Sequence, residues 1–209
     1  MKAARLAEQI AEAAAGRSRL LVAIAGPPGC GKSTIAEGLL GLLERHLPGC
    51  CGLVPMDGYH YDNAVLEQRG LLWRKGAPET FDAGGLLADL GRIKAAGGEV
   101  AVPVFDRVAD LARAGARIIQ LRHRIVMVEG NYLLLDEDIW RQIGELFDLT
   151  LFLDVDDAEL ERRLVRRWLD HGFVEESARH RALSNDMPNA QLVKARSRPA
   201  SVVVTALEL

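Results

Sequence analysis

The stretch Gly26-Pro27-Pro28-Gly29-Cys30-Gly31-Lys32-Ser33 decides the fold of this chain. It matches the pattern G-x-x-x-x-G-K-[ST] at every fixed position, and it lies between an apolar run at 20–25 and a helix-like run at 34–43. Glycines let successive backbone N–H groups turn inward, and the N-terminus of the following helix adds roughly half a positive charge. A glycine-rich turn that binds nothing is the alternative, but the strand before and the helix after predict a phosphate-binding loop.

The side chains at the end of this loop predict how a nucleotide is held. Lys32 is expected to reach the β- and γ-phosphates, and the Ser33 hydroxyl is expected to ligate Mg²⁺. Backbone N–H groups of the whole loop contribute to the same anion site. The residues that we expect to bind the nucleotide are Gly26, Pro27, Pro28, Gly29, Cys30, Gly31, Lys32, Ser33 and Thr34.

Length and composition fit a single globular domain spanning 1–209. Of the 209 residues, 49% are apolar and 26% are charged, which is ordinary for a soluble protein. The formal net charge of −3 gives no reason to expect nucleic acid as a partner, because proteins that bind it are usually basic. No apolar run approaches the roughly 20 residues that a membrane helix needs, so we expect no membrane partner.

The cysteines and the N-terminus predict the compartment. Cys30, Cys50 and Cys51 are odd in number, two are adjacent and one lies in the loop, which does not resemble a disulfide framework. The stretch 1–16 predicts an amphipathic helix, and its two glutamates and short apolar segments argue against a transit or signal peptide. We therefore expect a cytoplasmic protein, and we leave a homodimer open as its assembly.

Strands and helices alternate along the chain. Apolar strands are expected at 20–25, 50–55, 125–129, 149–154 and 201–205, and helices at 1–16, 33–47, 86–96 and 157–171. Continuous apolar strands separated by helices predict an α/β fold, with a five-stranded parallel sheet sandwiched by helices. The long stretch 58–124 is too long for a plain connection, and we interpret it as an insertion that binds the acceptor. It should contain an extended pair near 100–105 and 117–121.

Polar residues at the ends of the predicted strands are the candidates for chemistry, because ligands of such sheets bind outside the carboxyl ends of the strands. These residues are Asp57, Glu129 and Asp154. We predict that Asp57 accepts or steers the proton of an attacking hydroxyl, although a turn or helix-cap role is the alternative. Glu129 ends a buried strand and is predicted to hold Mg²⁺, because an unpaired buried carboxylate is costly. The two carboxylates could exchange these roles, which makes Asp57 a metal candidate as well.

Four arginines lie on the helix predicted after the fourth strand. The spacing i, i+4 stacks Arg163 over Arg167 and Arg162 over Arg166 on the helix surface. One pair could close over the phosphates as a lid, which we place at about 157–180, and we favour Arg163 and Arg167 for this role. The alternative is a solvated helix face, since Glu159 also lies four residues before Arg163 and would form a weak local ion pair.

With these residues in view, the chain resembles the phosphoribulokinase/uridine kinase family of P-loop kinases over 20–204. The branch that it resembles is that of the pantothenate-kinase-like proteins, including proteins labelled as fructose transport system kinases. The phrases that carry the resemblance are Met56-Asp57-Gly58-Tyr59-His60-Tyr61-Asp62-Asn63, Arg69-Gly70, Arg74-Lys75-Gly76-Ala77-Pro78-Glu79-Thr80-Phe81-Asp82, Pro103-Val104-Phe105-Asp106, Glu129-Gly130-Asn131-Tyr132 and Asn185-Asp186-Met187-Pro188-Asn189-Ala190.

The resemblance implies a P-loop NTPase fold, ATP as phosphoryl donor, Mg²⁺ and a small-molecule hydroxyl acceptor. It also implies that Asp57 is the catalytic aspartate and that Arg163 and Arg167 are lid arginines, alongside Lys32 as a catalytic residue. The residues expected near the acceptor are Tyr59, His60, Arg74, Asp82, Phe105, Asp106, Arg107 and Asn131.

Departures from the family patterns bear on the acceptor. Pantothenate kinases have Pro-Val-Tyr-Ser-His where this chain has Pro103-Val104-Phe105-Asp106-Arg107, and they place a longer segment before the phosphate loop. Uridine kinases carry a Tyr-Asp-Phe phrase and a distal histidine that this chain lacks. These differences argue against pantothenate and uridine, and the label of the pantothenate-kinase-like branch favours a sugar.

We therefore expect an ATP-dependent kinase that phosphorylates a sugar or sugar-like metabolite, with a nucleoside or pantothenate-type kinase as the alternative. A regulatory NTP hydrolase without an acceptor is an alternative of a different class. The chain has no Asn-Lys-x-Asp motif, and its only Asp-x-x-Gly sequence, at 82–85, does not follow a predicted strand. A non-catalytic nucleotide sensor is disfavoured by the intact Lys32, Ser33, Asp57 and Glu129.

Overall fold

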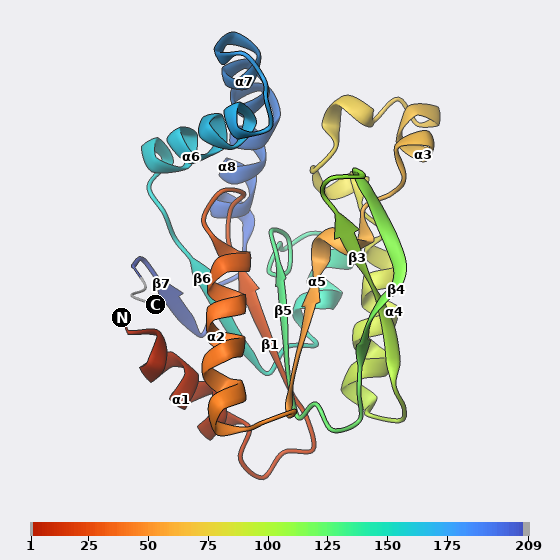
Figure 1. Cartoon of the computed structure of the whole chain (residues 1–209), viewed down its shortest axis with the longest axis vertical. Coiled ribbons are helices and arrows are strands. Elements are labelled where there is room, and N and C mark those ends of the chain that lie inside the picture. The colour runs from red at the N-terminus through yellow and green to blue at the C-terminus, as the bar shows by residue number, and fades with distance from the viewer. Residues whose placement is uncertain (1, 207–209) are drawn as a thin grey trace.

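The computed structural model describes residues 2–206. Its centre is a five-stranded sheet with the spatial order β2-β5-β1-β6-β7 (Figure 1). The strands are β1 (Leu20–Ala25), β2 (Cys51–Pro55), β5 (Ile125–Gly130), β6 (Leu149–Leu153) and β7 (Val202–Val204). Each neighbouring pair is parallel. The predicted five-stranded parallel sheet is therefore confirmed, and each strand end lies within one residue of its expected position.

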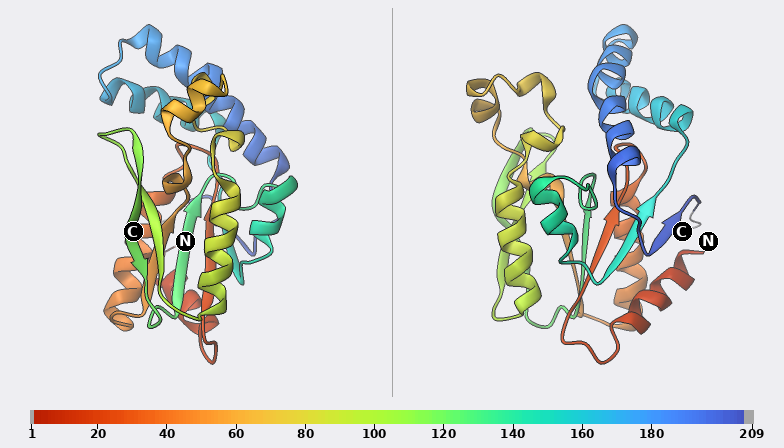
Figure 2. Two further views of the ribbon diagram at one scale, coloured as in Figure 1. Left: turned by 90° about the vertical axis from the view of Figure 1, so that its right-hand side faces the viewer. Right: turned by 180° about the vertical axis from the view of Figure 1, so that it is seen from behind.

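The sheet is covered on both faces, which explains why its strands are apolar throughout (Figure 2). One core lies between the sheet and three helices, α1 (Ala3–Ala13), α2 (Lys32–His46) and α6 (Asp157–Asp170). The opposite core contains α4 (Ala83–Ala95) and α5 (Asp138–Gly144). Successive β1 side chains alternate between the two, with Leu20, Val22 and Ile24 in the first core and Leu21, Ala23 and Ala25 in the second.

Helix α1 is shorter than the sequence suggests. It occupies Ala3–Ala13 rather than the predicted 1–16, and Met1 lies outside the described residues. Its buried stripe consists of Ala3, Leu6, Ala7 and Ile10, which pack against the same core as α2. The helix therefore forms because it buries one apolar face, as its periodicity predicted.

The insertion after β2 begins with a 3₁₀ turn, Met56–Tyr59, and continues through α3 (Asn63–Gln68) and α4 to an antiparallel hairpin of β3 (Val100–Asp106) and β4 (Leu111–Ile119). The sequence predicts the first strand well but wrongly places the second at 117–121. Alanine and glycine dominate the start of β4, and its strand form depends on pairing with β3 rather than on local propensity. The register shifts between Val102 and Val104, around Pro103, which has no N–H to donate to the ladder.

The C-terminal third forms a helical layer above the carboxyl ends of the strands (Figure 1). After α6 come α7 (Glu175–Arg181), a π-helical turn at Ala182–Asp186 and α8 (Met187–Arg196). The sequence does not predict α7 or α8, because neither shows a long apolar periodicity of its own. The helical layer and the insertion thus rise on either side of the sheet end where β1, β2 and β5 terminate.

Candidate active site

The phosphate-binding loop joins β1 to α2 and has the backbone conformation that its glycines permit. Gly26, Gly29 and Gly31 have φ values of 151°, 80° and 94°, which residues with a side chain rarely adopt. A Cβ atom at Gly26 would also lie 2.7 Å from the carbonyl oxygen of Leu153. The loop therefore curls tightly onto the end of β6, and its closing residue Gly31 leads directly into the N-terminus of α2.

Lys32 is held across the loop by the backbone. Its side chain is 8% exposed, and its Nζ atom donates a hydrogen bond to the carbonyl of Pro27 at 2.9 Å. The thiol of Cys30 lies 3.7 Å from the same nitrogen. A buried ammonium that has only neutral partners, beside a helix N-terminus, favours an anion as a ligand. The loop thus fits the phosphates of a nucleotide, as the sequence predicts.

Glu129 lies at the carboxyl end of β5, between its two neighbouring strands. It stands in register with Ile24 of β1 and Pro55 of β2, and it is 7% exposed. Burial and the negative charge of Asp57 raise the pKa of the Glu129 carboxyl group, while a hydrogen bond from Ser33 and the charge of Lys32 oppose this rise. A cation beside Glu129 would relieve both unfavourable effects.

The residues around Glu129 fit Mg²⁺ as a ligand. The Ser33 hydroxyl, the Glu129 carboxylate and the nearby Asp57 carboxylate are oxygen donors of the kind that this ion prefers. Within residues 2–206, no three His, Cys, Asp or Glu side chains converge closely enough to hold a metal alone. Mg²⁺ is usually held by one or two carboxylates together with water and substrate phosphates, and this donor set suits that mode.

Asp57 shares a cavity with Ser33 and Glu129. The cavity has a volume of about 160 Å³ and lies between α2, the end of β2 and the β3–β4 hairpin. Asp57 comes from the 3₁₀ turn after β2, and its Oδ2 accepts a hydrogen bond from Nη2 of Arg107 at 2.9 Å. The complete lining of the cavity is Ser33, Glu37, Leu53, Pro55, Asp57, Val104, Phe105, Arg107, Arg117 and Glu129.

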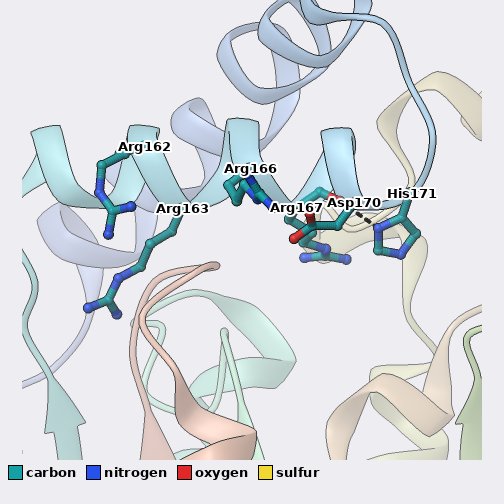
Figure 3. A pocket seen from close by; sticks show the side chains of 6 residues that line it. All are labelled: Arg162, Arg163, Arg166, Arg167, Asp170 and His171. Carbon is teal, nitrogen blue, oxygen red and sulfur yellow. Dashed lines mark hydrogen bonds and ion pairs between the residues drawn. The ribbon is translucent and has the colours of Figure 1, made fainter.

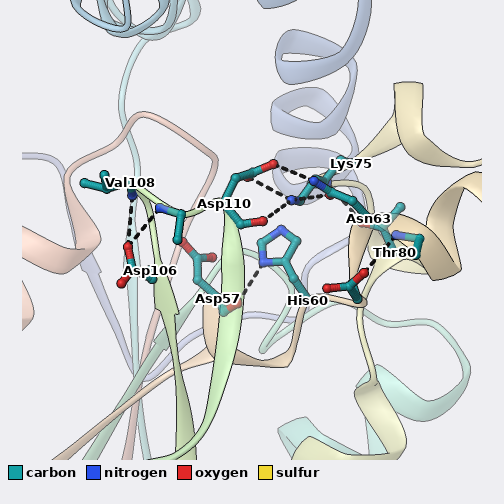
Figure 4. A network of polar contacts seen from close by, with 12 residues as sticks. Asp57, His60, Asn63, Lys75, Thr80, Asp106, Val108 and Asp110 are labelled. Carbon is teal, nitrogen blue, oxygen red and sulfur yellow. Dashed lines mark hydrogen bonds and ion pairs between the residues drawn. The ribbon is translucent and has the colours of Figure 1, made fainter.

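An aromatic and polar network borders this cavity (Figure 4). The His60 ring packs against Phe81 and Phe105, with centroid distances of 4.0 and 4.9 Å, and burial lowers its pKa. Nδ1 of His60 lies 2.8 Å from the Asp57 carbonyl, which ties the ring to the 3₁₀ turn. Next to this network, Lys75 bonds to Asn63 and Asp110 and lies 5.0 Å from the centre of the Phe105 ring.

Helix α6 carries the four predicted arginines along one open hollow of about 410 Å³ (Figure 3). Arg163 extends toward the phosphate-binding loop, and its Nη1 donates to the Cys30 carbonyl at 3.4 Å. Glu159 accepts bonds from Arg162 and Arg163, and these bonds lower the pKa of its carboxyl group to about 2. Arg163 therefore forms the local ion pair with Glu159 and also reaches the phosphate-binding loop.

The other lid arginines differ in their partners. Arg166 pairs with Asp170 at 2.9 Å on the exposed side of α6. Arg167 lies over the ring of Trp168, with 5.8 Å between its guanidinium carbon and the ring centroid. Arg167 also lines the hollow beside the loop, so its predicted role over the phosphates stays a prediction.

Several residues predicted near the acceptor make structural contacts elsewhere. The buried Tyr59 donates its hydroxyl to Asp89 of α4 at 2.9 Å, and burial raises its pKa. The Asp82 carboxylate caps the N-terminus of α4 by accepting from the Gly85 N–H. Arg74 pairs with Glu79 at 2.9 Å. None of these three side chains lines the cavity that holds Asp57.

Asp106 and Asn131 lie near the cavity but do not line it. The Asp106 carboxylate accepts from the backbone N–H groups of Val108 and Ala109, and thereby closes the hairpin turn (Figure 4). Asn131 is half-buried and directly follows β5. Phe105 and Arg107 are the predicted acceptor residues that do line the cavity. The roles of all these residues in binding stay predictions.

Two side chains of the site, Glu37 and Arg117, are not predicted from the sequence. Glu37 lies one helical turn after Ser33 and lines the same cavity, a position that the i, i+4 spacing could have indicated. Arg117 reaches the cavity from β4, and its Nη1 donates to the carbonyl of Leu53 at 2.8 Å. No local pattern identifies Arg117, because its position depends on the register of the hairpin. Glu159 entered only as an alternative partner of Arg163.

A parallel α/β sheet, a glycine-rich phosphate loop and carboxylates at the ends of the adjacent strands define a P-loop kinase. Residues 21–207 match the sequence profile of the Phosphoribulokinase / Uridine kinase family. The chain belongs to this family, and it is a phosphotransferase that acts on an alcohol group of a small molecule.

Individual relatives agree with this assignment. The crystal structure of a "putative fructose transport system kinase" from Silicibacter sp. TM1040 superimposes with a TM-score of 0.89 at 43% identity, covering 98% of this chain and 100% of that one. Protein YggC of Escherichia coli K12 is 33% identical over 91% of this chain and 79% of its own length. A pantothenate kinase of Enterococcus faecalis is 34% identical over 74% of this chain but 52% of its own length. This chain thus spans about half of that pantothenate kinase.

Proposed function

We propose that this protein transfers the γ-phosphoryl group of ATP to a hydroxyl group of a sugar or sugar-like metabolite, with Mg²⁺ as cofactor. The observation that carries the proposal is the single cavity that brings Asp57 next to Ser33 and Glu129 at the mouth of the phosphate loop. The similarity to a protein described as a putative fructose transport system kinase supports the sugar class. Mg²⁺, when bound, supplies charge neutralisation between the β- and γ-phosphates.

In this proposal, the loop holds the donor and Asp57 serves the acceptor. The acceptor oxygen attacks the γ-phosphorus, the bond from that phosphorus to the β–γ bridging oxygen breaks, and ADP leaves. Asp57 accepts the proton of the attacking hydroxyl. Lys32, released from the Pro27 carbonyl, would contact the phosphates, and Ser33 and Glu129 would hold the metal. Each of these side chains thus has one defined role in the transfer.

The arginines of α6 would neutralise charge on the transferred group. Arg163 already reaches the loop, so a small shift of its guanidinium from Glu159 to a phosphate would exchange one anionic partner for another. Arg167 lines the same hollow and is the second candidate for this role. This arrangement supports a lid function for α6, since both arginines belong to an element that lies above the loop.

The direct test is an ATP-consumption assay over a panel of sugars, nucleosides and pantothenate. We expect ADP formation that depends on a sugar-like acceptor and on Mg²⁺. Preferred turnover of a nucleoside or of pantothenate would replace the sugar assignment with that alternative. Phosphate release that is independent of every acceptor would instead support the NTP hydrolase alternative.

Two further parts of the proposal concern the setting of the enzyme. We propose a cytoplasmic location, supported by three cysteines that are all free in the structure. No helix within residues 2–206 is long and apolar enough to cross a membrane. We also keep a homodimer as an alternative to a monomer, and light scattering of the purified chain distinguishes the two.

A further inference from the structure

Two arginines of the β3–β4 hairpin line the cavity that contains Asp57. Arg107 follows the end of β3, and Arg117 belongs to β4. They bring two permanent positive charges to a wall that the proposed function assigns to a hydroxyl acceptor. A neutral sugar needs no such charges, because hydroxyl groups are recognised equally well by amides and carboxylates.

Arg107 occupies one oxygen of the carboxylate that the proposed function makes the proton acceptor. Its guanidinium donates to Oδ2 of Asp57 at 2.9 Å, in an ion pair whose Arg107 side chain is 51% exposed and whose Asp57 side chain is 27% exposed. One of the two oxygens of this carboxylate is thus engaged by a guanidinium and is no longer available to a substrate hydroxyl. A partner that takes Arg107 away from Asp57 when the acceptor binds would free both oxygens of the carboxylate.

Arg117 provides a second cation with unused donors. It is half-buried, and its Nη1 donates to the carbonyl of Leu53 at 2.8 Å. Among the described residues, no carboxylate lies within ion-pair distance of Arg117, although nearly every other arginine of the hairpin and of α6 has one. A guanidinium has five N–H donors, so Arg117 can bind an anion without giving up its bond to Leu53.

We propose, on the basis of the kinase function above, that the acceptor carries a carboxylate or phosphate group that binds Arg107 and Arg117. The anion takes the guanidinium of Arg107 in a two-bond contact, and the carboxylate of Asp57 becomes free for the hydroxyl proton. The enzyme is thereby selective for sugar acids or sugar phosphates over neutral sugars, because a neutral acceptor leaves Asp57 in its ion pair. Planar guanidinium groups match both anions.

The nearby carboxylates do not oppose this assignment. Glu129 lies next to Ser33 and is assigned to the metal, whose charge offsets its own. Glu37 lies on the α2 side of the cavity, across from the hairpin that carries the two arginines. Arg163 of α6 contacts the phosphate loop, so the donor phosphates have a cation on a different element from the two hairpin arginines.

The test compares matched pairs of acceptors that differ in one anionic group. The pairs are D-glycerate and glycerol, D-gluconate and D-glucitol, and D-fructose 6-phosphate and D-fructose, assayed with ATP and Mg²⁺. We expect at least one anionic member to exceed its neutral partner by about tenfold or more in kcat/KM, with the difference shrinking as salt is added. The first two pairs test a carboxylate, and the third tests a phosphate.

Variants separate the anion contact from general damage. Arg107→Gln should lower kcat/KM for the anionic acceptor about tenfold or more relative to kcat/KM for its neutral partner, because the anion loses its contact. Arg107→Lys should restore part of the loss. Arg117→Gln should raise KM for the anionic acceptor. Arg141→Gln is the control, since Arg141 is also a half-exposed arginine paired with an aspartate, but on α5; it should change neither acceptor.

A binding measurement separates this inference from the kinase proposal. The melting temperature of each variant is measured with the same six compounds in the presence of Mg²⁺ and a non-hydrolysable ATP analogue. If ATP is hydrolysed without any acceptor, the kinase proposal fails, yet an anion-dependent shift that Arg107→Gln abolishes still supports the anion site. Equal or absent effects of the two members of every pair, in both assays, overturn the anion site whatever the kinase activity.

Discussion

Arg163 and Arg107 approach the reaction centre from opposite sides, and each is held by a carboxylate. Arg163 pairs with Glu159 four positions earlier on the same helix, whereas Arg107 pairs with Asp57, which lies 50 positions away in the chain. The first pair follows from helix geometry alone. The second exists only because the hairpin folds back onto the turn after β2.

The site therefore has two halves that are built differently: a donor half around the phosphate-binding loop and an acceptor half around Asp57. The donor half uses consecutive residues, a loop and the helix that follows it, so its geometry is largely local. The acceptor half combines a turn, a hairpin and a strand end that meet only in the tertiary structure. If the two halves act separately, a substitution in one half should leave the function of the other half nearly unchanged.

Asp57→Asn should separate the halves most strongly. The amide keeps the size of the side chain but cannot accept the hydroxyl proton, so we expect kcat to fall by about 10³, within the range typical for general bases. ATP affinity, measured by calorimetry, should change little. An equal loss of ATP affinity and turnover would assign Asp57 to the metal. It would also show that the donor and acceptor halves do not act separately.

Lys32→Ala should act on the donor half. Removing the buried ammonium takes away a contact to the phosphates, and we expect a loss of about 10² in kcat/KM for ATP, comparable to the loss of one oxyanion donor. Nucleotide binding or turnover should weaken, while the KM of the acceptor changes little. Unchanged kinetics would refute the assignment of the phosphate loop.

Arg163→Gln tests the lid. If Arg163 moves from Glu159 to the transferred phosphoryl group, its loss should reduce kcat by about 10², less than a dedicated arginine finger contributes because Arg167 remains. Arg166→Gln is the matched control, since Arg166 also has an acidic partner on α6 but points to solvent. An unchanged kcat in both variants would identify the arginines of this helix face as solvated side chains without a role in transfer.

Gly58→Ala tests the contact between the turn after β2 and strand β3, on which the acceptor half depends. A Cβ atom at Gly58 would lie 2.6 Å from the carbonyl carbon of Pro103 in β3, where backbone must move. We expect a loss of about 1–3 kcal/mol in the free energy of unfolding, as for other overpacked sites. Gly91→Ala in α4 meets no atom within 4 Å and should be neutral or stabilising by about 0.5–1 kcal/mol. Urea unfolding compares the two variants.

The smallest expected effect is the contribution of His60 to the pH dependence of the free energy of unfolding. Burial lowers its folded-state pKa below the ordinary value of 6.5, so between these two values the unfolded chain binds the proton and the folded chain does not. Stability should therefore fall as the pH drops below 6.5, by less than about 1 kcal/mol from this group. His60→Gln should flatten the difference between unfolding at pH 7.5 and 5.5. An unchanged difference would show that the pKa of His60 is the same in the folded and unfolded chains and would contradict the lowering by burial.

The sequence predicts the donor half better than the acceptor half, for reasons visible at particular residues. The strands of the sheet are continuous and apolar, and the order of loop and helix around Lys32 is local, so both appear in the periodicity. The contact of Tyr59 with Asp89 depends on how the turn after β2 packs against α4. The pairing of Arg107 with Asp57 and the position of Arg117 in the cavity depend on the register of the hairpin. No short-range signal encodes that register, since β4 begins with small residues that favour no strand.

The β3–β4 hairpin also has a consequence for the behaviour of the chain in a crowded solution. Strand β2 ends the sheet on one side, and an open edge strand offers its N–H and C=O groups to any passing chain. The hairpin lies over this edge: Arg117 bonds to the Leu53 carbonyl, and Ile119 lies against Gly52. The segment that carries the proposed substrate selectivity thus also blocks intermolecular strand pairing.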